Sequence, residues 1–414
     1  MKKALLILAV LMLSMSVLPV VVAQDTEEEE APLERADADF VVWVDSNYVD
    51  AMQEIGDQFA ADFGVTVAVQ ESTLGDVDNV IPVAAPAGQG PDVFFTAHDK
   101  LGNLVSGGLV APIEIANPDG FAESAVNAFL YNGDFYGIPF SIENIAFFRN
   151  VDLVPEAPAT WDEVVAISEE LAADNGDNFE ENSYGFVRQG GDPYHFFPIQ
   201  TAFGGYVFGL TEEGYDPTDV GIGSEGSLAA AEFWANYVEE GLQPPGVDWD
   251  LLHAMFEDGQ AAMIITGPWA LDRIRESGVN YAISDLPAET ESGKPFLGVW
   301  GFVVNSFSEQ QMLAGIFLNE YVATDESMMA LYEANKRGPA WNATIEAVDD
   351  ADLAAITSAG IEGLAMPAIP AMAQVWTAWT DAINLIQEQG EDPDATFENA
   401  AEQIETLIAE SQEN

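Results

Sequence analysis

Trp269 lies where a predicted strand gives way to a helix, and an aromatic side chain at such a junction tends to face a cleft. The run Ala262–Ile265 is short and apolar, which predicts a buried strand. Thr266-Gly-Pro ends that strand, and a helix is expected to begin at Trp269. An indole in this position is a flat apolar plate, and such a plate packs well on the C–H face of a sugar ring.

Carboxylates at strand ends and helix starts would supply the polar part of such a cleft. The hydroxyl rim of a neutral sugar needs fixed acceptors, and hydrogen bonds to ionised groups are the strong ones. Asp45 and Asp99 follow predicted strands, and Glu143 stands in apolar surroundings where a carboxylate normally has a designated partner. Structural roles remain open at this point, since Asp45 and Asp99 are also suited to capping a helix.

Further aromatic residues divide between the core and a candidate cleft. Trp43 lies inside an apolar strand and is expected in the core. Trp376 and Trp379 stand three residues apart on one predicted helix, so at least one of them is expected to pack internally. Tyr194 follows Pro193 in a loop, which favours a functional position.

The order of predicted elements indicates an α/β fold. Strands at Phe40–Val44, 65–69 and 91–95 alternate with a helix whose apolar residues recur at steps of three and four and with a second helix around 76–85. The pattern β-α-β-α-β begins a doubly wound sheet. The near-continuous apolar character of the first strand is typical of a sheet covered on both faces.

The second half of the chain contributes a further set of elements. Thr160-Trp-Asp-Glu163 is a capping box that predicts a helix start. The remaining expectations are strands at Tyr281–Ser284 and Phe296–Val304, helices at Leu228–Glu240, Trp249–Glu257 and Gln310–Ala323, and two long helices over Ala368–Ser411 interrupted near Gly390–Asp394. Together these predict two α/β lobes.

Composition narrows the function classes. The formal net charge of −60 excludes nucleic acid and anionic membranes as partners, because both require a basic patch. The acidity fits either a protein from salty surroundings or a generic acidic secreted protein. The chain has no Cys, so disulfides and thiolate chemistry are excluded. The three histidines lack ligand spacing, and neither a metal nor another cofactor is expected.

The N-terminal residues predict export. Two lysines, an apolar core and a Val-Val-Ala end form a signal peptide over 1–23, with an uncleaved membrane anchor as the alternative. The acidic segment 24–39 is predicted to be a disordered linker. We therefore expect an exported protein, in the periplasm or at the extracellular cell surface.

Many segments in one order resemble the maltose- and maltodextrin-binding proteins, the extracellular solute-binding proteins of ATP-binding-cassette (ABC) sugar importers. The likeness covers the chain from Phe40 onward, and it is carried by Gly90–Lys100, Tyr131-Asn-Gly, Ile142–Asn144, Asp192–Tyr194, Gly204–Tyr206, Met263–Trp269, Lys294–Phe296, Met366-Pro, Ile369-Pro370 and Trp376. The resemblance implies a two-lobed periplasmic-binding-protein-like fold, each lobe a sheet flanked by helices, with the ligand cleft between the lobes.

The implied lobes are 40–141 with 302–345, and 146–297 with 352–414. Hinge crossings are then expected near 141–146, 298–302 and 346–352. The resemblance also implies a receptor that is not an enzyme, binds maltodextrin-type oligosaccharides, delivers them to a membrane permease and acts as a monomer.

The family's ligand-binding positions fall on residues of this chain. They imply sugar contacts at Asp45, Asp99, Lys100, Glu143, Asp192, Tyr194, Trp269 and Trp376. Two departures stand out. Lys100 replaces a more usual Arg, which turns a bidentate fork into a point charge, and Thr96 replaces a stacking Trp.

These departures keep other functions open. A different oligosaccharide such as trehalose is a serious rival ligand. A secreted glycoside hydrolase would need two of the carboxylates Asp45, Asp99, Glu143 and Asp192 as an acid/base pair, and nothing in the sequence pairs them. A receptor for a polyamine or a peptide is the third alternative.

Overall fold

The computed structural model describes residues 35–413 except 174, 177 and 212–213. The predicted signal peptide and most of the predicted acidic linker therefore lie outside the described residues. Within the described part of the chain, no helix combines the length and the apolar character that crossing a membrane requires.

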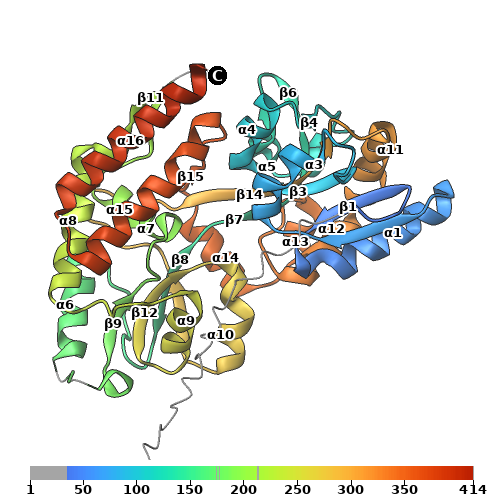
Figure 1. The fold of residues 1–414 in the computed structure, drawn as a ribbon. Coiled ribbons are helices and arrows are strands. Elements are labelled where there is room, and N and C mark those ends of the chain that lie inside the picture. Colours follow the sequence, from blue (N-terminus) through green and yellow to red (C-terminus); the bar gives the residue numbers. More distant parts are fainter. Residues whose placement is uncertain (1–34, 174, 177, 212–213, 414) are drawn as a thin grey trace, which may run out of the picture. The chain divides into compact units, whose positions relative to one another are not determined.

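The first sheet has seven strands, in the order β15-β14-β3-β1-β2 with β4 and β7 also paired to β14 (Figure 1). β1 is parallel to β2 and β3, whereas β14 is antiparallel to β3 and β7. The strands are β1 Phe40–Val44, β2 Val67–Glu71, β3 Val93–Ala97, β4 Val110–Ala111, β7 Gly137–Glu143, β14 Phe296–Asn305 and β15 Leu364–Ala365.

The second sheet has four strands in the order β13-β8-β12-β9. They are β8 Ala146–Asn150, β9 Tyr184–Val187, β12 Ala261–Thr266 and β13 Tyr281–Ser284. Two hairpins complete the strands, β5 Leu130–Tyr131 with β6 Asp134–Phe135, and β10 Phe208–Thr211 with β11 Gly214–Val220.

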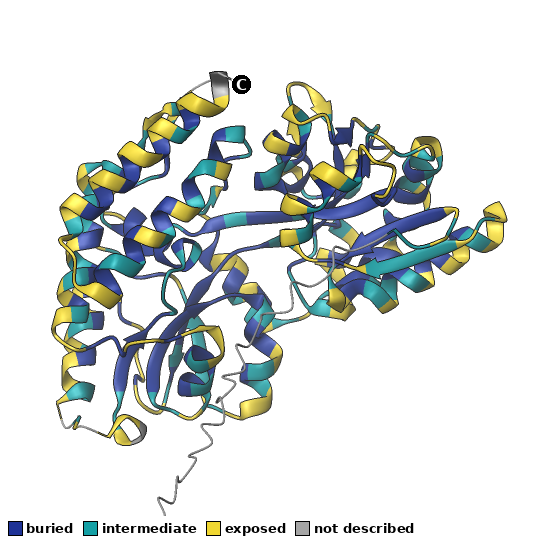
Figure 2. Ribbon diagram, in the orientation of Figure 1, coloured by how far each residue is buried: buried dark blue, intermediate teal, exposed yellow. Residues whose placement is uncertain are grey.

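Helices flank both sheets. Those in the chain segments of the first sheet are α1 Val49–Phe63, α2 Leu74–Asn79, α3 Ile81–Ala84, α4 Leu101–Ser106, α5 Glu123–Ala128, α11 Gln311–Ile316, α12 Asp325–Asn335 and α13 Asn342–Ala347. The others are α6 Trp161–Ala172, α7 Pro193–Ala202, α8 Glu225–Glu239, α9 Trp249–Glu257, α10 Leu271–Ser277, α14 Ala351–Ala359, α15 Val375–Gln389 and α16 Pro393–Glu413. The inner strands β1, β3 and β12 are buried, whereas the edge strands β2 and β13 are only partly buried, and many exposed positions lie on the outer helix faces (Figure 2). The described chain thus forms a two-lobed α/β fold.

Up to α14 the chain changes sheets at three places, and β15 afterwards pairs once more with β14 in the first sheet. β7 belongs to the first sheet and β8 to the second, so the first change falls between Glu143 and Ala146. β14 returns the chain to the first sheet, although its first residue, Phe296, packs in the core of the second lobe. The third change lies between α12 and α14, because α14 packs on strands of the second sheet. These three segments connect the two lobes.

Most of the boundaries predicted from the sequence agree with the structure within two residues, but α8 begins three residues earlier than predicted, and Tyr194, expected in a loop, lies in the first turn of α7. β2 and β3 each begin two residues later than predicted, and the helix predicted around 76–85 is divided at Val80 into α2 and α3, with Pro82 near the start of α3. The helix predicted over 310–323 continues as a π-helical segment, Phe317–Val322.

The start of α6 differs in one contact from the predicted capping box. The Thr160 hydroxyl accepts the backbone N–H of Glu163, as expected. The Glu163 carboxylate, however, accepts the N–H of Ala159 rather than that of Thr160.

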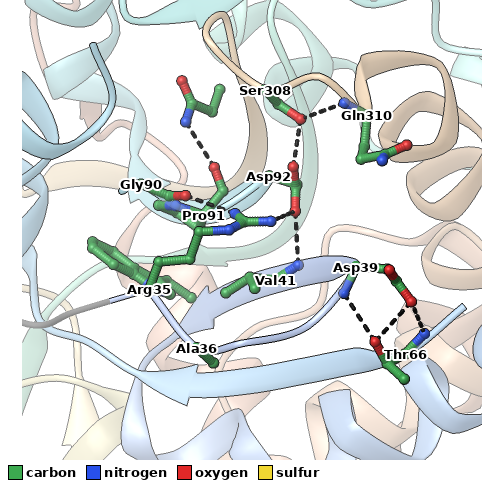
Figure 3. Close-up of polar contacts among 12 residues, drawn as sticks. Arg35, Ala36, Asp39, Val41, Thr66, Gly90, Pro91, Asp92, Ser308 and Gln310 are labelled. Carbon is green, nitrogen blue, oxygen red and sulfur yellow. Dashed lines mark hydrogen bonds and ion pairs between the residues drawn. The ribbon is translucent and has the colours of Figure 1, made fainter. Parts of the chain in front are cut away.

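Residues 35–39 correct the predicted extent of the disordered linker, because they are held against the first sheet (Figure 3). Arg35 donates from Nη2 to the buried carboxylate of Asp92 at 2.8 Å. Asp39 accepts the backbone N–H and the hydroxyl of Thr66, both at 2.8 Å. Sequence composition alone does not reveal these contacts, because the partners lie far along the chain.

Candidate functional site

A cleft of about 520 Å³ brings together side chains from both lobes. This volume is typical of small-molecule sites. Its lining residues are Leu74, Ala97, Asp99, Lys100, Glu143, Asp192, Tyr194, His195, Trp269, Trp300, Arg337, Met366 and Trp376. Seven of the eight side chains singled out from the sequence are in this set, and Asp45 is not.

Aromatic rings form one wall of the cleft. Trp269 lies on the 3₁₀ segment Pro268–Ala270 that follows β12, as the strand-to-helix pattern predicts. Its ring centroid is 6.2 Å from that of Tyr194. Trp376 lines the cleft from α15, whereas Trp379 on the same helix is fully buried. Of these two indoles, Trp379 therefore packs in the core and Trp376 is available to a ligand.

The Tyr194 hydroxyl is buried and has no hydrogen-bond partner among the described residues. Burial, together with the negative charge of Glu143, raises the pKa of Tyr194 well above its usual value. The phenol therefore stays protonated at neutral pH and can donate a hydrogen bond. The Tyr194 hydroxyl therefore has hydrogen-bonding capacity that no described residue uses, and its side chain lines the cleft.

Asp192 is the N-cap residue of α7, and both of its carboxylate oxygens accept hydrogen bonds. Its Oδ1 caps the helix by accepting the N–H of Tyr194 at 2.8 Å and of His195 at 3.2 Å. Its Oδ2 accepts from Nδ1 of His195 at 2.6 Å and from the amide of Gln189. Burial acts to raise the pKa of Asp192, but His195 outweighs it and holds that pKa well below its usual range. The carboxylate is therefore ionised and fixed in direction.

Asp99 and Lys100 reach the cleft from the 3₁₀ segment His98–Lys100 at the end of β3. Asp99 caps no helix, since Ala97 precedes this segment and Lys100 precedes α4. Burial raises the pKa of Asp99, and the charge of Lys100 partly offsets that effect. Lys100 itself is tied to Asp78 by an ion pair of 3.0 Å.

His98 fixes the backbone on which Asp99 stands. Its Nδ1 accepts the N–H of Val299 at 3.1 Å, and its Nε2 lies 3.1 Å from the carbonyl oxygen of Met366. Because a carbonyl only accepts, Nε2 must carry the proton. Burial lowers the pKa of this histidine, so it remains neutral and structural.

Glu143 lies at the base of the cleft, at the end of β7, with both oxygens engaged. Oε1 accepts from the indole N–H of Trp300 at 2.7 Å, and Oε2 accepts from Nη1 of Arg337 at 2.7 Å. The guanidinium of Arg337 also lies over the rings of Trp300 and Trp269, at 5.0 and 5.7 Å from their centroids. The cleft therefore contains a cation that lies close to two indole rings.

Comparison with known proteins shows the family to which this chain belongs. A family model for bacterial extracellular solute-binding proteins matches residues 54–356. The chain belongs to this family. A maltodextrin-binding protein of Bacillus subtilis (strain 168) is 31% identical over 350 residues, which cover 81% of this chain and 82% of that protein.

Two further relatives match this chain over most of their own length. A galactooligosaccharide-binding protein of Bacillus subtilis (strain 168) is 28% identical over 391 residues, 91% of each chain. A maltooligosaccharide ABC transporter solute-binding lipoprotein of Streptococcus pneumoniae (strain ATCC BAA-255 / R6) is 27% identical over 385 residues, 84% of this chain and 88% of that one.

In this solute-binding protein, Asp45 has a capping geometry. It precedes the 3₁₀ segment Ser46–Tyr48, and its Oδ1 accepts the backbone N–H of Asn47 at 3.0 Å and the side-chain amide of the same residue at 2.7 Å. The capping role left open by the sequence is therefore the one the structure shows, and the side chain lies outside the cleft lining.

The sequence analysis missed Trp300 and Arg337, which complete the cleft of this solute-binding protein. Trp300 lies within the predicted strand Phe296–Val304, and local pattern does not tell which of its faces meets a cleft. Arg337 had one signal, its rarity, because the chain has only 11 Lys and Arg among 414 residues. A basic residue retained in so acidic a chain is a candidate for a specific partner.

Proposed function

We propose that this protein is the substrate-binding component of an ABC importer for neutral oligosaccharides, with maltodextrins as the expected ligands. Its two lobes close over the sugar by bending at the three segments where the chain changes sheets. The observation that carries the proposal is the cleft itself, in which indole plates stand beside fixed carboxylates and a guanidinium.

This combination of groups fits the chemistry of a sugar. The apolar face of a pyranose packs on Trp269 or Trp376, and this contact removes apolar surface from water. The hydroxyl rim meets Asp99, Arg337 and the unpartnered hydroxyl of Tyr194. Affinity then comes from stacking together with charge-assisted hydrogen bonds.

The names of the relatives support the same ligand class. Two of the three described above are named for maltodextrin or maltooligosaccharide, and the third for galactooligosaccharide. The proposal also includes export to the cell exterior, delivery of the sugar to a membrane permease, and action as a monomer. Receptors of this type generally work in this way.

The engaged state of the carboxylates supports binding without catalysis. A glycoside hydrolase needs two carboxyl groups free to exchange protons or attack the sugar. Glu143 is held by Trp300 and Arg337, and Asp192 is held by His195 and the backbone of α7. Asp45 lies outside the cleft lining, so of the four candidate carboxylates only Asp99 remains as a candidate acid, which is one group too few.

A calorimetric titration of the protein beginning at Gln24 tests the proposal. The ligands are maltose, maltotriose, trehalose, a galactooligosaccharide and spermidine, with tryptophan fluorescence as a second readout. We expect saturable binding of maltotriose with a change in indole emission. Binding of the galactooligosaccharide or trehalose alone would retain a sugar receptor and reject the maltodextrin assignment. A response only to spermidine would reject the carbohydrate function.

A further inference from the structure

Arg337 stands on a short connection that is fixed to the floor of the cleft. The connection follows α12, and its Gly338 carbonyl accepts the backbone N–H of Ile142 in β7 at 2.7 Å. A Cβ at Gly338 would lie only 2.4 Å from the carbonyl oxygen of Ile142, so only glycine permits this close approach. The backbone therefore holds Arg337 beside Glu143, the last residue of β7, after which the chain leaves the first sheet.

Most of the hydrogen-bonding capacity of Arg337 is unused. A guanidinium has five N–H donors in a planar fork. Among the described residues, the Arg337 side chain makes one hydrogen bond, from Nη1 to Glu143, and its buried Nε has no partner. The side chain is nevertheless a cleft-lining group, with 16% of its surface exposed. A stacked, oriented guanidinium with spare donors is suited to receive two neighbouring oxygens of a ligand.

The charges around Arg337 indicate whether the ligand oxygens that it binds belong to a neutral or to an acidic group. Glu143 offsets the positive charge of Arg337 at 2.7 Å, and Lys100 is paired with Asp78. Asp99 and Asp192 add negative charge to the same cleft. An acidic ligand would therefore meet no net positive field, whereas a neutral diol would meet directed donors.

We propose that Arg337 is a ligand-contacting, specificity-determining residue that donates to a pair of adjacent sugar hydroxyls, and that its ion pair with Glu143 makes the site select uncharged sugars over acidic ones. The inference rests on the proposed function.

Calorimetry on the full protein and two variants tests this inference, with maltotriose and its aldonic acid as the paired neutral and acidic probes. Arg337→Lys keeps the charge and removes the fork, so we expect the affinity for maltotriose to fall by about 10- to 100-fold, as for loss of charged hydrogen bonds. The melting temperature should stay close to that of the wild type. Arg273→Lys is the matched control, because Arg273 contacts Glu257 outside the cleft.

Glu143→Gln supplies an independent readout. It keeps the shape of the side chain and leaves the charge of Arg337 unbalanced, so the ratio of neutral to acidic affinity should fall by at least about tenfold relative to the wild type. An Arg337→Lys protein that binds maltotriose within twofold of the wild type would overturn the inference, as would an unchanged ratio in Glu143→Gln. If the wild type binds no sugar, the proposed function itself fails, which is a different result.

Discussion

Replacing Trp269 with alanine is expected to weaken oligosaccharide binding by about 30- to 1,000-fold, because a central aromatic anchor typically contributes about 2 to 4 kcal/mol. The indole is half-buried at the cleft wall, with Tyr194 and His195 at 6.2 and 5.9 Å between ring centroids. Its removal takes away a stacking plate and also one of the two indoles that lie close to the Arg337 guanidinium. Isothermal titration with maltotriose measures the loss.

Trp249→Ala is the matched control for this prediction. Trp249 begins α9, is 38% exposed and lies 4.8 Å beneath the guanidinium of Arg273, so it is also an indole stacked on an arginine. It does not line the cleft. Equal affinities in Trp269→Ala and Trp249→Ala would show that Trp269 is not a ligand plate.

Replacing Arg188 with alanine should lower the free energy of unfolding by about 3 to 5 kcal/mol, through a large cavity and lost hydrogen bonds. Arg188 is 1% exposed, and its Nη2 donates to the backbone oxygen of Asp192 at 2.7 Å. Its guanidinium lies over the rings of Trp234 and Phe196. Burial lowers its pKa to about 10, so the side chain remains charged at neutral pH.

Urea denaturation checks this second prediction. The midpoint should move to lower urea with an unchanged slope, which marks a loss of stability rather than a change in unfolding cooperativity. Arg273→Ala is the control and should cost less than about 1 kcal/mol, because its ion pairs lie nearer the surface. A loss below 1 kcal/mol in Arg188→Ala would mean that Arg188 does not support the start of α7.

The parts of the site that the sequence predicts well are those fixed by local structure. Trp269 follows a strand stop that Gly and Pro impose, and Asp99 follows the end of β3. The local pattern alone directs Trp269 to the cleft, whereas for Asp99 it also allows a capping role, and the family resemblance favours the cleft. Asp45 also follows a strand, but the amide of Asn47 two residues later captures its carboxylate.

The parts that the sequence does not reveal depend on contacts between distant residues. Arg337 and Glu143 are 194 residues apart, and Trp300 and Glu143 are 157 apart. No local periodicity encodes either pair. The same limit applies to Arg35, whose partner Asp92 is 57 residues away and turns the end of a polar segment into an ordered one.

A crystal structure of the protein grown with maltotriose tests the central claim most directly. The account predicts a pyranose ring packed on Trp269 or Trp376, with adjacent hydroxyls hydrogen-bonded to Arg337 and to Asp99. A maltotriose molecule bound elsewhere on the protein, or bound in the cleft without contact to these indoles, would contradict it.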